Sequence, residues 1–466
     1  MTGAAELTGV AATALAAIVA RREASAEEVV SAHLARIAEV DGALNAVVAL
    51  APERALAEAR AADAAVGRGE APGPLHGVPF TAKDNLEAAG LPMAIGVPER
   101  SRTVPEADAT AVARLREAGA ILLGKTNCPP WGGGIETDNP VHGRTNNPYD
   151  LDRTPGGSSG GEAAIVAAGG SACGLGTDSG ASARLPAHFC GLAAIKPTAG
   201  RVPITGVIDD EGPLGALSDP RTQVSPIART VADVALLLRI VAGPDSTDGG
   251  VAPVALGDPG AIDVAGLHVA VHTDNGLATP TPETVATVRD AAAALRVAGA
   301  HVEEARPPAG GHELTLDIWR SYDGAMSSLD LYRVLRRWDA YRAEMLTFAD
   351  PYDLILSPVF PSPARRHGAM HVPGEIEPTS YTTPANLTGW PAATVRCGTS
   401  PEGLPIGVQL IARPWRDDVA LAAALHLERE LGGFRAPAAA VAPPANTVAP
   451  GPGAADPPAP GPAAAR

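Results

Sequence analysis

Lysine is almost missing from this chain. Only three of its 36 lysine and arginine residues are lysines, Lys83, Lys125 and Lys196, and the other 33 are arginines. A guanidinium stays charged at any working pH, whereas a desolvated lysine amine can lose its proton and act as a base. Because arginine supplies the ordinary positive charge, each lysine is a candidate for a role that needs an amine.

Basic clusters, paired cysteines and long apolar runs are missing as well. The net charge of -16 and the lack of any basic run argue against direct binding to nucleic acid. The four cysteines form no C-x-x-C pair, so we interpret them as free thiols in a reducing cytoplasm. The apolar stretch 10–20 is too short to span a bilayer and no basic segment precedes it. We therefore expect a cytoplasmic protein that does not contact a membrane.

The residues that are present predict alternating helices and strands. Residues 1–65 have helical periodicity, and Ser25 with Glu28 has the spacing of a capping box. From Gly77 onward, short β-rich runs alternate with amphipathic segments, which is typical of a layered α/β fold. The strand candidates are 120–123, 172–176, 268–272, 354–358 and 406–411, and the helix candidates are 107–117, 230–241, 282–297 and 419–431.

The chain divides into one expected folded body and one tail. No Pro- or Ser-rich linker interrupts residues 1–434, so we expect the helical segment 1–65 to pack on a single large domain at 66–434. Residues 435–466 consist mostly of Ala, Pro and Gly, which bury too little apolar surface to offset the entropy of the chain. We predict that this tail is disordered.

Two runs rich in glycine and serine carry the candidate chemistry. The first, residues 154–162, reads TPGGSSGGE and leads directly into an apolar helical run. It could be a flexible linker, but a glycine-rich turn that enters a helix presents backbone NH groups at a fixed place. A phosphate-binding loop is disfavoured because the run lacks a Gly-Lys-Ser/Thr ending.

The second run, residues 176–186, follows a predicted strand and reads GTDSGASARLP. Small residues around Ser182 would let a substrate approach closely, and successive NH groups in such a turn can bind an oxyanion. Ser182 is therefore a candidate nucleophile. The alternative interpretation is a tight turn with a capping serine.

A nucleophilic serine needs a base, which is usually a histidine. The histidines nearest to the two runs have no distinctive catalytic setting, and we expect structural roles for them: His76, His142 and His188. Lys83 ends the apolar run 77–85, which would carry its side chain into the interior, so it is a candidate buried base. For Lys125 and Lys196 we favour roles as structural hydrogen-bond donors.

Four of these segments together match a known pattern. They are residues 156–162, the serine 24 positions after Ser158, the strand ending at residues 83–85, and residues 124–127. Similar segments follow over most of the chain, at 36–40, 229–233, 352–358, 386–391 and 403–410. In this order they resemble the amidase signature family of serine hydrolases.

The resemblance implies a single large α/β domain with a mixed, twisted sheet between helical layers. It also implies a Ser-Ser-Lys triad, with Ser182 as nucleophile, Ser158 as bridging serine and Lys83 as base. The bridging serine of the family follows a cis peptide bond, here Gly157-Ser158. Neither a metal nor an organic cofactor is required.

Further site residues follow from the same resemblance. The oxyanion hole would consist of the backbone NH groups of Ser179, Gly180, Ala181 and Ser182. Supporting positions would be held by Ser159, Asp178 and Arg184. Ala181 stands where the family commonly has a glycine, so a positive φ there would cost roughly 1 kcal/mol or more. Residues 309–352, which help to build the acyl pocket in the family, look short here.

The function implied by the resemblance is hydrolysis of a small-molecule carboxamide to a carboxylic acid and ammonia or an amine. One alternative is a glutaminase-type component of a tRNA-dependent amidotransferase. Another is a binding relative that has lost catalysis, although all three triad residues are present. A homodimer is possible, and the substrate itself stays open.

Overall fold

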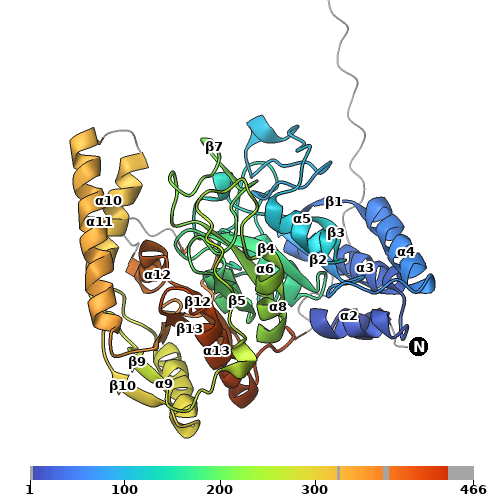
Figure 1. Ribbon diagram of the computed structural model, residues 1–466. Coiled ribbons are helices and arrows are strands. Elements are labelled where there is room, and N and C mark those ends of the chain that lie inside the picture. Colours follow the sequence, from blue (N-terminus) through green and yellow to red (C-terminus); the bar gives the residue numbers. More distant parts are fainter. Residues whose placement is uncertain (1–3, 323–325, 371–376, 439–466) are drawn as a thin grey trace, which may run out of the picture.

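The computed structural model of the chain describes residues 4–322, 326–370 and 377–438 (Figure 1). Residues 435–438 have no secondary structure, and the rest of the predicted tail, 439–466, lies outside the described residues. Within the described part of the chain, no helix is long and apolar enough to cross a bilayer.

An 11-stranded sheet forms the centre of the molecule. Its strands are β1 (Val47–Leu50), β2 (Pro79–Lys83), β3 (Ile121–Thr126), β4 (Cys173–Asp178), β5 (Ala193–Lys196), β8 (Gln223–Ala228), β9 (His268–Val271), β10 (His301–Glu304), β11 (Leu354–Pro358), β12 (Ala392–Thr399) and β13 (Pro405–Ala412). The strand order is β1-β3-β2-β4-β8-β5-β12-β13-β11-β9-β10. The sheet is mixed, because β2 is parallel to β3 and β4 whereas β8 and β13 are antiparallel to their neighbours. A separate hairpin joins β6 (Ile208–Asp209) to β7 (Gly212–Pro213).

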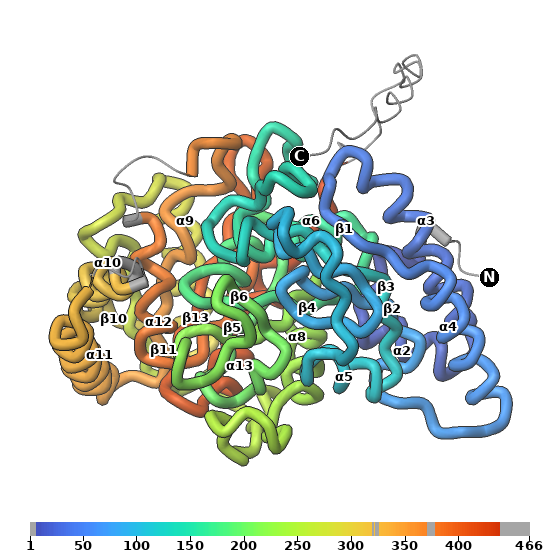
Figure 2. Tube along the Cα trace, turned by 90° about the horizontal axis from the view of Figure 1, so that it is seen from above, coloured from blue at the N-terminus to red at the C-terminus, as the bar shows by residue number. Residues whose placement is uncertain are grey.

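Helices surround this sheet (Figures 1 and 2). They are α1 (Ala4–Leu7), α2 (Ala12–Ala20), α3 (Ala26–Leu44), α4 (Pro52–Gly67), α5 (Thr110–Glu117), α6 (Gly160–Ala167), α7 (Arg184–Phe189), α8 (Val231–Val241), α9 (Pro282–Val297), α10 (Gly311–Tyr322), α11 (Ser328–Ala349), α12 (Thr383–Thr388) and α13 (Asp417–Leu431). Because helices cover the sheet, strands such as β3 and β13 are buried along their whole length.

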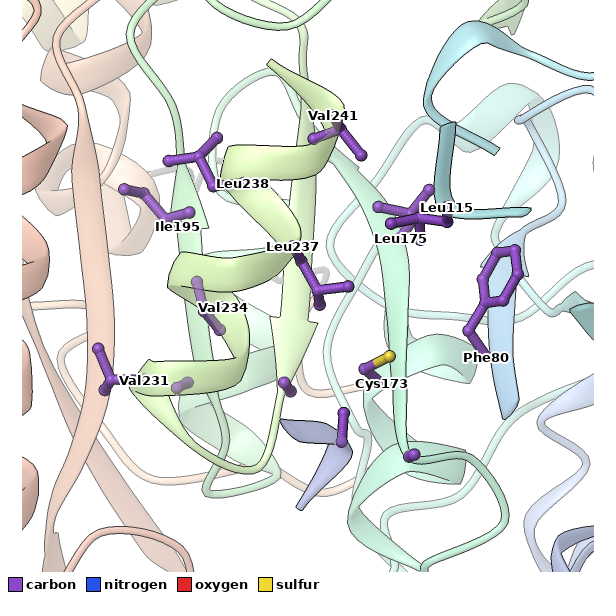
Figure 3. Packing of buried hydrophobic residues seen from close by; sticks show 14 of the residues in the cluster. Phe80, Leu115, Cys173, Leu175, Ile195, Val231, Val234, Leu237, Leu238 and Val241 are labelled. Atoms are coloured by element: carbon purple, nitrogen blue, oxygen red, sulfur yellow. The ribbon is translucent and has the colours of Figure 1, made fainter. Parts of the chain in front are cut away.

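Helix α8 illustrates how the sequence pattern builds the core. Its apolar residues recur at helical intervals and form one buried stripe. Figure 3 shows Val234 and Leu237 of this helix beside Ile195 of β5 and Leu175 of β4, and all four are fully buried in one apolar cluster. Burial of such side chains contributes about 1.5–3 kcal/mol each to folding.

The predicted elements correspond closely to the observed ones. The five strand candidates are β3, β4, β9, β11 and β13, and the four helix candidates are α5, α8, α9 and α13, with boundaries shifted by a few residues. The predicted fold class, one large α/β domain with a mixed sheet between helices, is confirmed. The division into residues 1–65 and 66–434 stays a prediction.

The N-terminal region differs from the prediction in one place. The Ser25 hydroxyl accepts from the Glu28 N–H and the Glu28 carboxylate accepts from the Ser25 N–H, as a capping box requires. However, residues 1–65 are not entirely helical, because β1 pairs antiparallel with β3 at the edge of the sheet. The partner of this four-residue strand lies more than 70 positions further along the chain, so local periodicity carried no signal for it.

Candidate active site

Lys83 is the last residue of β2, and its side chain is completely buried. Its Nζ lies 2.7 Å from Ser158 Oγ and 2.7 Å from Thr177 Oγ1, and donates to both. Burial lowers the pKa of the Lys83 amine to about 8, although the nearby negative charge of Asp178 opposes this shift. A neutral amine is therefore accessible close to neutral pH.

The two serine-containing runs lie against each other at this amine. The Gly157-Ser158 peptide bond is cis, as the resemblance implied. Ser158 is buried, and the backbone N–H of Ser159 donates to the carbonyl oxygen of Ser182 at 3.0 Å. The bond between residues 159 and 182 thus brings the first run, which contacts Lys83, directly beside the second.

Residues 179–182 form the turn after β4 and line a cavity of about 650 Å³. In the described part of the chain, the backbone N–H groups of Gly180, Ala181 and Ser182 donate no hydrogen bond. These three N–H groups are available to an oxyanion. Ala181 is not among the residues with positive φ, so the strain considered for this position does not arise.

A buried ion pair holds this turn. Arg184 Nε and Nη2 each donate to a different carboxylate oxygen of Asp178 at 2.9 Å, and both side chains are completely buried. Burial alone would raise the pKa of the Asp178 carboxyl, but the Arg184 guanidinium lowers it to about 2. Arg184 also donates to the Thr382 carbonyl and to Gln409 Oε1, at 2.9 and 3.1 Å. Asp178 and Arg184 therefore connect the turn to α12 and β13.

The other two lysines are also completely buried. Lys125 Nζ donates to the Asp84 carbonyl oxygen at 3.1 Å and forms an ion pair with its carboxylate at 3.4 Å. Lys196 Nζ donates to the Pro197 carbonyl oxygen at 2.7 Å, and burial lowers the pKa of its amine to about 7. These contacts are typical of structural hydrogen-bond donors.

No histidine is among the residues that line the cavity in the described structure. Gly407 N–H donates to His188 Nδ1 at 2.7 Å, so Nε2 carries the proton and donates to the Ser362 carbonyl. Burial lowers the pKa of this imidazole to about 4. His76 Nε2 lies 3.1 Å from the Ala62 carbonyl oxygen, again a structural contact.

The walls of the cavity come from segments that sequence reasoning did not single out. Apolar walls are supplied by Trp131, Ile135, Ile208, Leu214 and Met370, and charged side chains by Asp209, Asp219 and Arg221. The segment 309–352, which looked short in the sequence, contributes none of the described lining residues. Its helices α10 and α11 pack against α12.

Sequence reasoning also missed several polar residues that hold the site together. Thr177 accepts a hydrogen bond from Lys83. The sequence could have indicated this residue, because it lies at the end of a predicted strand, one position before Asp178. Asn386 Nδ2 donates to Asp178 Oδ1 at 3.0 Å. The Ser179 hydroxyl is hydrogen-bonded to Thr222, which in turn donates to Asp219 at 2.5 Å. Among the described residues, no group of three or more His, Cys, Asp or Glu side chains could hold a metal ion.

Known proteins that are similar to this chain include amidases and amidotransferase subunits. The model of the Amidase family matches residues 28–332 and 322–421. A glutamyl-tRNA(Gln) amidotransferase subunit of Moorella thermoacetica is 36% identical over 91% of this chain and 97% of that protein. An acylamidase of Rhodococcus erythropolis is 34% identical over 90% of this chain and 94% of that protein. The structure of 6-aminohexanoate cyclic dimer hydrolase complexed with substrate has a TM-score of 0.82 at 29% identity, covering 93% of this chain and 99% of that chain.

The buried ion pair makes a prediction about stability. Asp178→Asn leaves the Arg184 charge buried without its carboxylate, which should lower the free energy of unfolding by about 3–5 kcal/mol at pH 7. Because the pKa of Asp178 lies below its ordinary value of 3.8, this contribution is complete above that pH and is lost as pH falls toward 2. Urea unfolding of both proteins between pH 7 and pH 2 measures the difference.

The exposed pair Arg68–Glu70 offers the matched control. Glu70→Gln makes the same chemical change on the surface, where it should have no measurable effect on unfolding. Equal stability of Asp178→Asn and wild type at pH 7 would show that the buried pair does not hold the turn.

Proposed function

Because this chain belongs to the amidase signature family, whose members hydrolyse amides, we propose that it cleaves a carboxamide to a carboxylic acid and ammonia or an amine. The observation that carries this proposal is the buried Lys83 amine 2.7 Å from Ser158 Oγ, with Ser182 in the adjacent run. Ser182 is the proposed nucleophile, Ser158 the bridging serine and Lys83 the base.

The first half of the proposed reaction forms an acyl-enzyme. Neutral Lys83 takes the proton of Ser158 while Ser158 takes the proton of Ser182. The Ser182 Oγ then forms a bond to the carbonyl carbon, and the carbonyl oxygen receives the electron pair of the broken π bond. Ser158 next gives its proton to the departing nitrogen, the C–N bond breaks, and Lys83 returns a proton to Ser158.

The second half hydrolyses the ester formed at Ser182. A water molecule loses a proton along the same path and attacks the acyl carbon, and Ser182 leaves with a proton from Ser158. The N–H groups of residues 179–182 stabilise the oxyanion in both halves, because they are fixed before the charge develops. Asp178 and Arg184 hold these donors in place, and Ser159 holds the two runs together.

The cavity supports a substrate of moderate size with apolar parts. Its volume of about 650 Å³ and its walls of Trp131, Ile208 and Met370 suit a small alkyl or aryl carboxamide. A binding relative without catalysis is disfavoured, because Lys83 and Ser158 are already in hydrogen-bond contact. A cytoplasmic location and the lack of nucleic-acid partners stay predictions.

A second candidate function rests on the relative from Moorella thermoacetica, which is 36% identical. Under this second candidate, the chain would be a glutaminase-type component that supplies ammonia to a tRNA-dependent amidotransferase. The proposed triad serves both candidates equally, so they differ in the amide that is cleaved and in the need for partner proteins.

A panel of amides separates the two candidates. The chain alone, given alkyl and aryl carboxamides, anilides and glutamine, should release ammonia or amine from at least one non-glutamine amide. Glutamine alone should give no release above background. Release from glutamine only after addition of amidotransferase partner proteins would favour the second candidate. If folded protein cleaves nothing in the panel under either condition, the hydrolase proposal fails.

The nucleophile can be identified covalently. A fluorophosphonate probe should label the protein at Ser182, and Ser182→Ala should abolish the label, which mass spectrometry of tryptic peptides detects. Ser179→Ala is the matched control, since this serine also lines the cavity but its hydroxyl is hydrogen-bonded to Thr222 and is not the proposed nucleophile. Labelling that persists in Ser182→Ala would assign the nucleophile to another residue.

The base has a signature in the pH profile. Protonated Lys83 cannot accept a proton, so kcat/KM should fall as pH drops below the pKa of about 8 and level off above it. Lys83→Arg and Lys83→Met should each lose about 10²–10⁴-fold in kcat/KM, because a guanidinium stays charged and a thioether binds no proton. Circular dichroism checks that both variants fold. An arginine variant with more than about a tenth of wild-type activity would contradict the mechanism.

A further inference from the structure

The outer side of α11 exposes much apolar surface. Five large hydrophobic side chains of this one helix are between 42% and 56% exposed: Leu329, Leu331, Tyr332, Leu335 and Leu346. Figures 1 and 2 show α11 at one edge of the molecule, away from the central sheet. Exposed apolar residues gathered on one element mark an interaction surface more often than residues scattered singly.

This surface is distinct from the face that holds α11 in the fold. Val334, Tyr341 and Met345 are buried in an apolar cluster with residues of α10 and α12. Trp338 Nε1 donates to the Leu387 carbonyl oxygen of α12 at 2.6 Å. The exposed leucines are therefore not needed to anchor the helix, and the described residues leave them uncovered.

Four residues of the exposed side form a self-complementary stripe. Leu335, Asp339, Arg342 and Leu346 follow one another at intervals of four, three and four, which places them on one face of the helix. Their order is apolar, acidic, basic, apolar. If two copies of α11 lie antiparallel around a two-fold axis between residues 340 and 341, each Leu335 meets Leu346 of the other copy. Each Asp339 then meets Arg342 of the other copy.

The two charges in this stripe are unsatisfied within one copy. Asp339 and Arg342 are both exposed, and neither forms an ion pair or side-chain hydrogen bond with a described residue. Two other arginines of the same helix are paired, Arg333 with Asp330 at 3.0 Å and Arg337 with Asp317 at 2.6 Å, whereas Arg336 is not paired with a described residue. The free pair thus lies in the middle of the apolar stripe, where a second copy would supply both partners.

We propose that the stripe Leu335, Asp339, Arg342 and Leu346 binds a second copy of this chain in an antiparallel, two-fold symmetric dimer. A two-fold interface uses the same patch on both copies. Such a patch must therefore be complementary to itself when its order is reversed, as this stripe is. An unrelated protein or a lipid surface would account for the leucines but not for the order of the two charges.

The dimer would also support a wall of the cavity. Trp338 of α11 is hydrogen-bonded to α12, and Thr383 at the start of α12 lines the same cavity as Ser182. Burying the outer face of α11 would reduce the mobility of this connection. The inference does not depend on the proposed hydrolase function, because association is measured without a substrate.

A charge-swap experiment tests the antiparallel pairing. Analytical ultracentrifugation of the full chain at physiological salt, over a range of concentrations, should detect a dimer. Asp339→Arg and Arg342→Asp should each weaken it at least about tenfold, because like charges then face each other across the two-fold axis. An equimolar mixture of the two variants should restore dimerisation, since every facing pair in the heterodimer is again opposite in charge.

Two further variants separate this interface from general effects of charge and shape. Glu344→Lys changes the charge by the same amount as Asp339→Arg but lies on the opposite side of α11, so it should leave the dimer intact. Leu335→Asp should give a monomer with an unchanged circular dichroism spectrum.

Three outcomes would overturn the proposal. Wild-type chain that is monomeric at every concentration would do so, as would a dimer that none of the stripe variants weakens. So would a monomer that binds phospholipid vesicles through these leucines. None of these results bears on amide hydrolysis, which the amide panel tests separately.

Discussion

The whole arrangement depends on keeping water away from one amine. Lys83 ends β2 between β3 and β4, and the parallel direction of these three strands brings their carboxyl ends to one edge of the sheet. Glu162 is buried among the same strands, where it is hydrogen-bonded to Thr81 of β2 and Thr126 of β3, and burial raises the pKa of its carboxyl to about 8. Burial thus favours the neutral form of both the Glu162 carboxyl and the Lys83 amine, which keeps unpaired charge out of the interior.

The turn that contains Ser182 is held by a charged pair, Asp178 and Arg184. Asp178 directly follows Thr177, which contacts the Lys83 amine. Asp178 and Arg184 lie at the two ends of the turn that contains Ser182, and their hydrogen bonds run to α12 and β13. These elements lie more than 200 residues after the turn in the sequence. The C-terminal half of the chain therefore fixes the geometry of a turn formed by the N-terminal half.

Whether a feature could be predicted from the sequence depends on how far apart in the sequence the interacting residues lie. The helix 282–297 and the strand 354–358 were predicted with the bounds that the structure shows, since the pattern of each is local. Lys83 and Ser182 became candidates because a rare residue type and a run of small residues are visible without a structure, whereas Ser158 became one only through the family resemblance. Strand β1, the contact of Thr177 with Lys83 and the walls of the cavity were missed, because each depends on residues brought together only by folding.

The partners of the three lysines explain why only Lys83 is placed to take a proton from a neighbouring side chain. Lys125 donates to a carboxylate and a carbonyl, and Lys196 donates to a carbonyl, so their partners can only accept. A neutral amine could still donate in these contacts, but neither partner has a proton to give to it. Lys83 instead contacts two hydroxyl groups, Ser158 and Thr177. A hydroxyl accepts from an ammonium ion and donates to a neutral amine, so both protonation states of Lys83 keep their hydrogen bonds. Rarity and burial are shared by all three lysines, whereas reversible partners belong to Lys83, and this property is what a base must have.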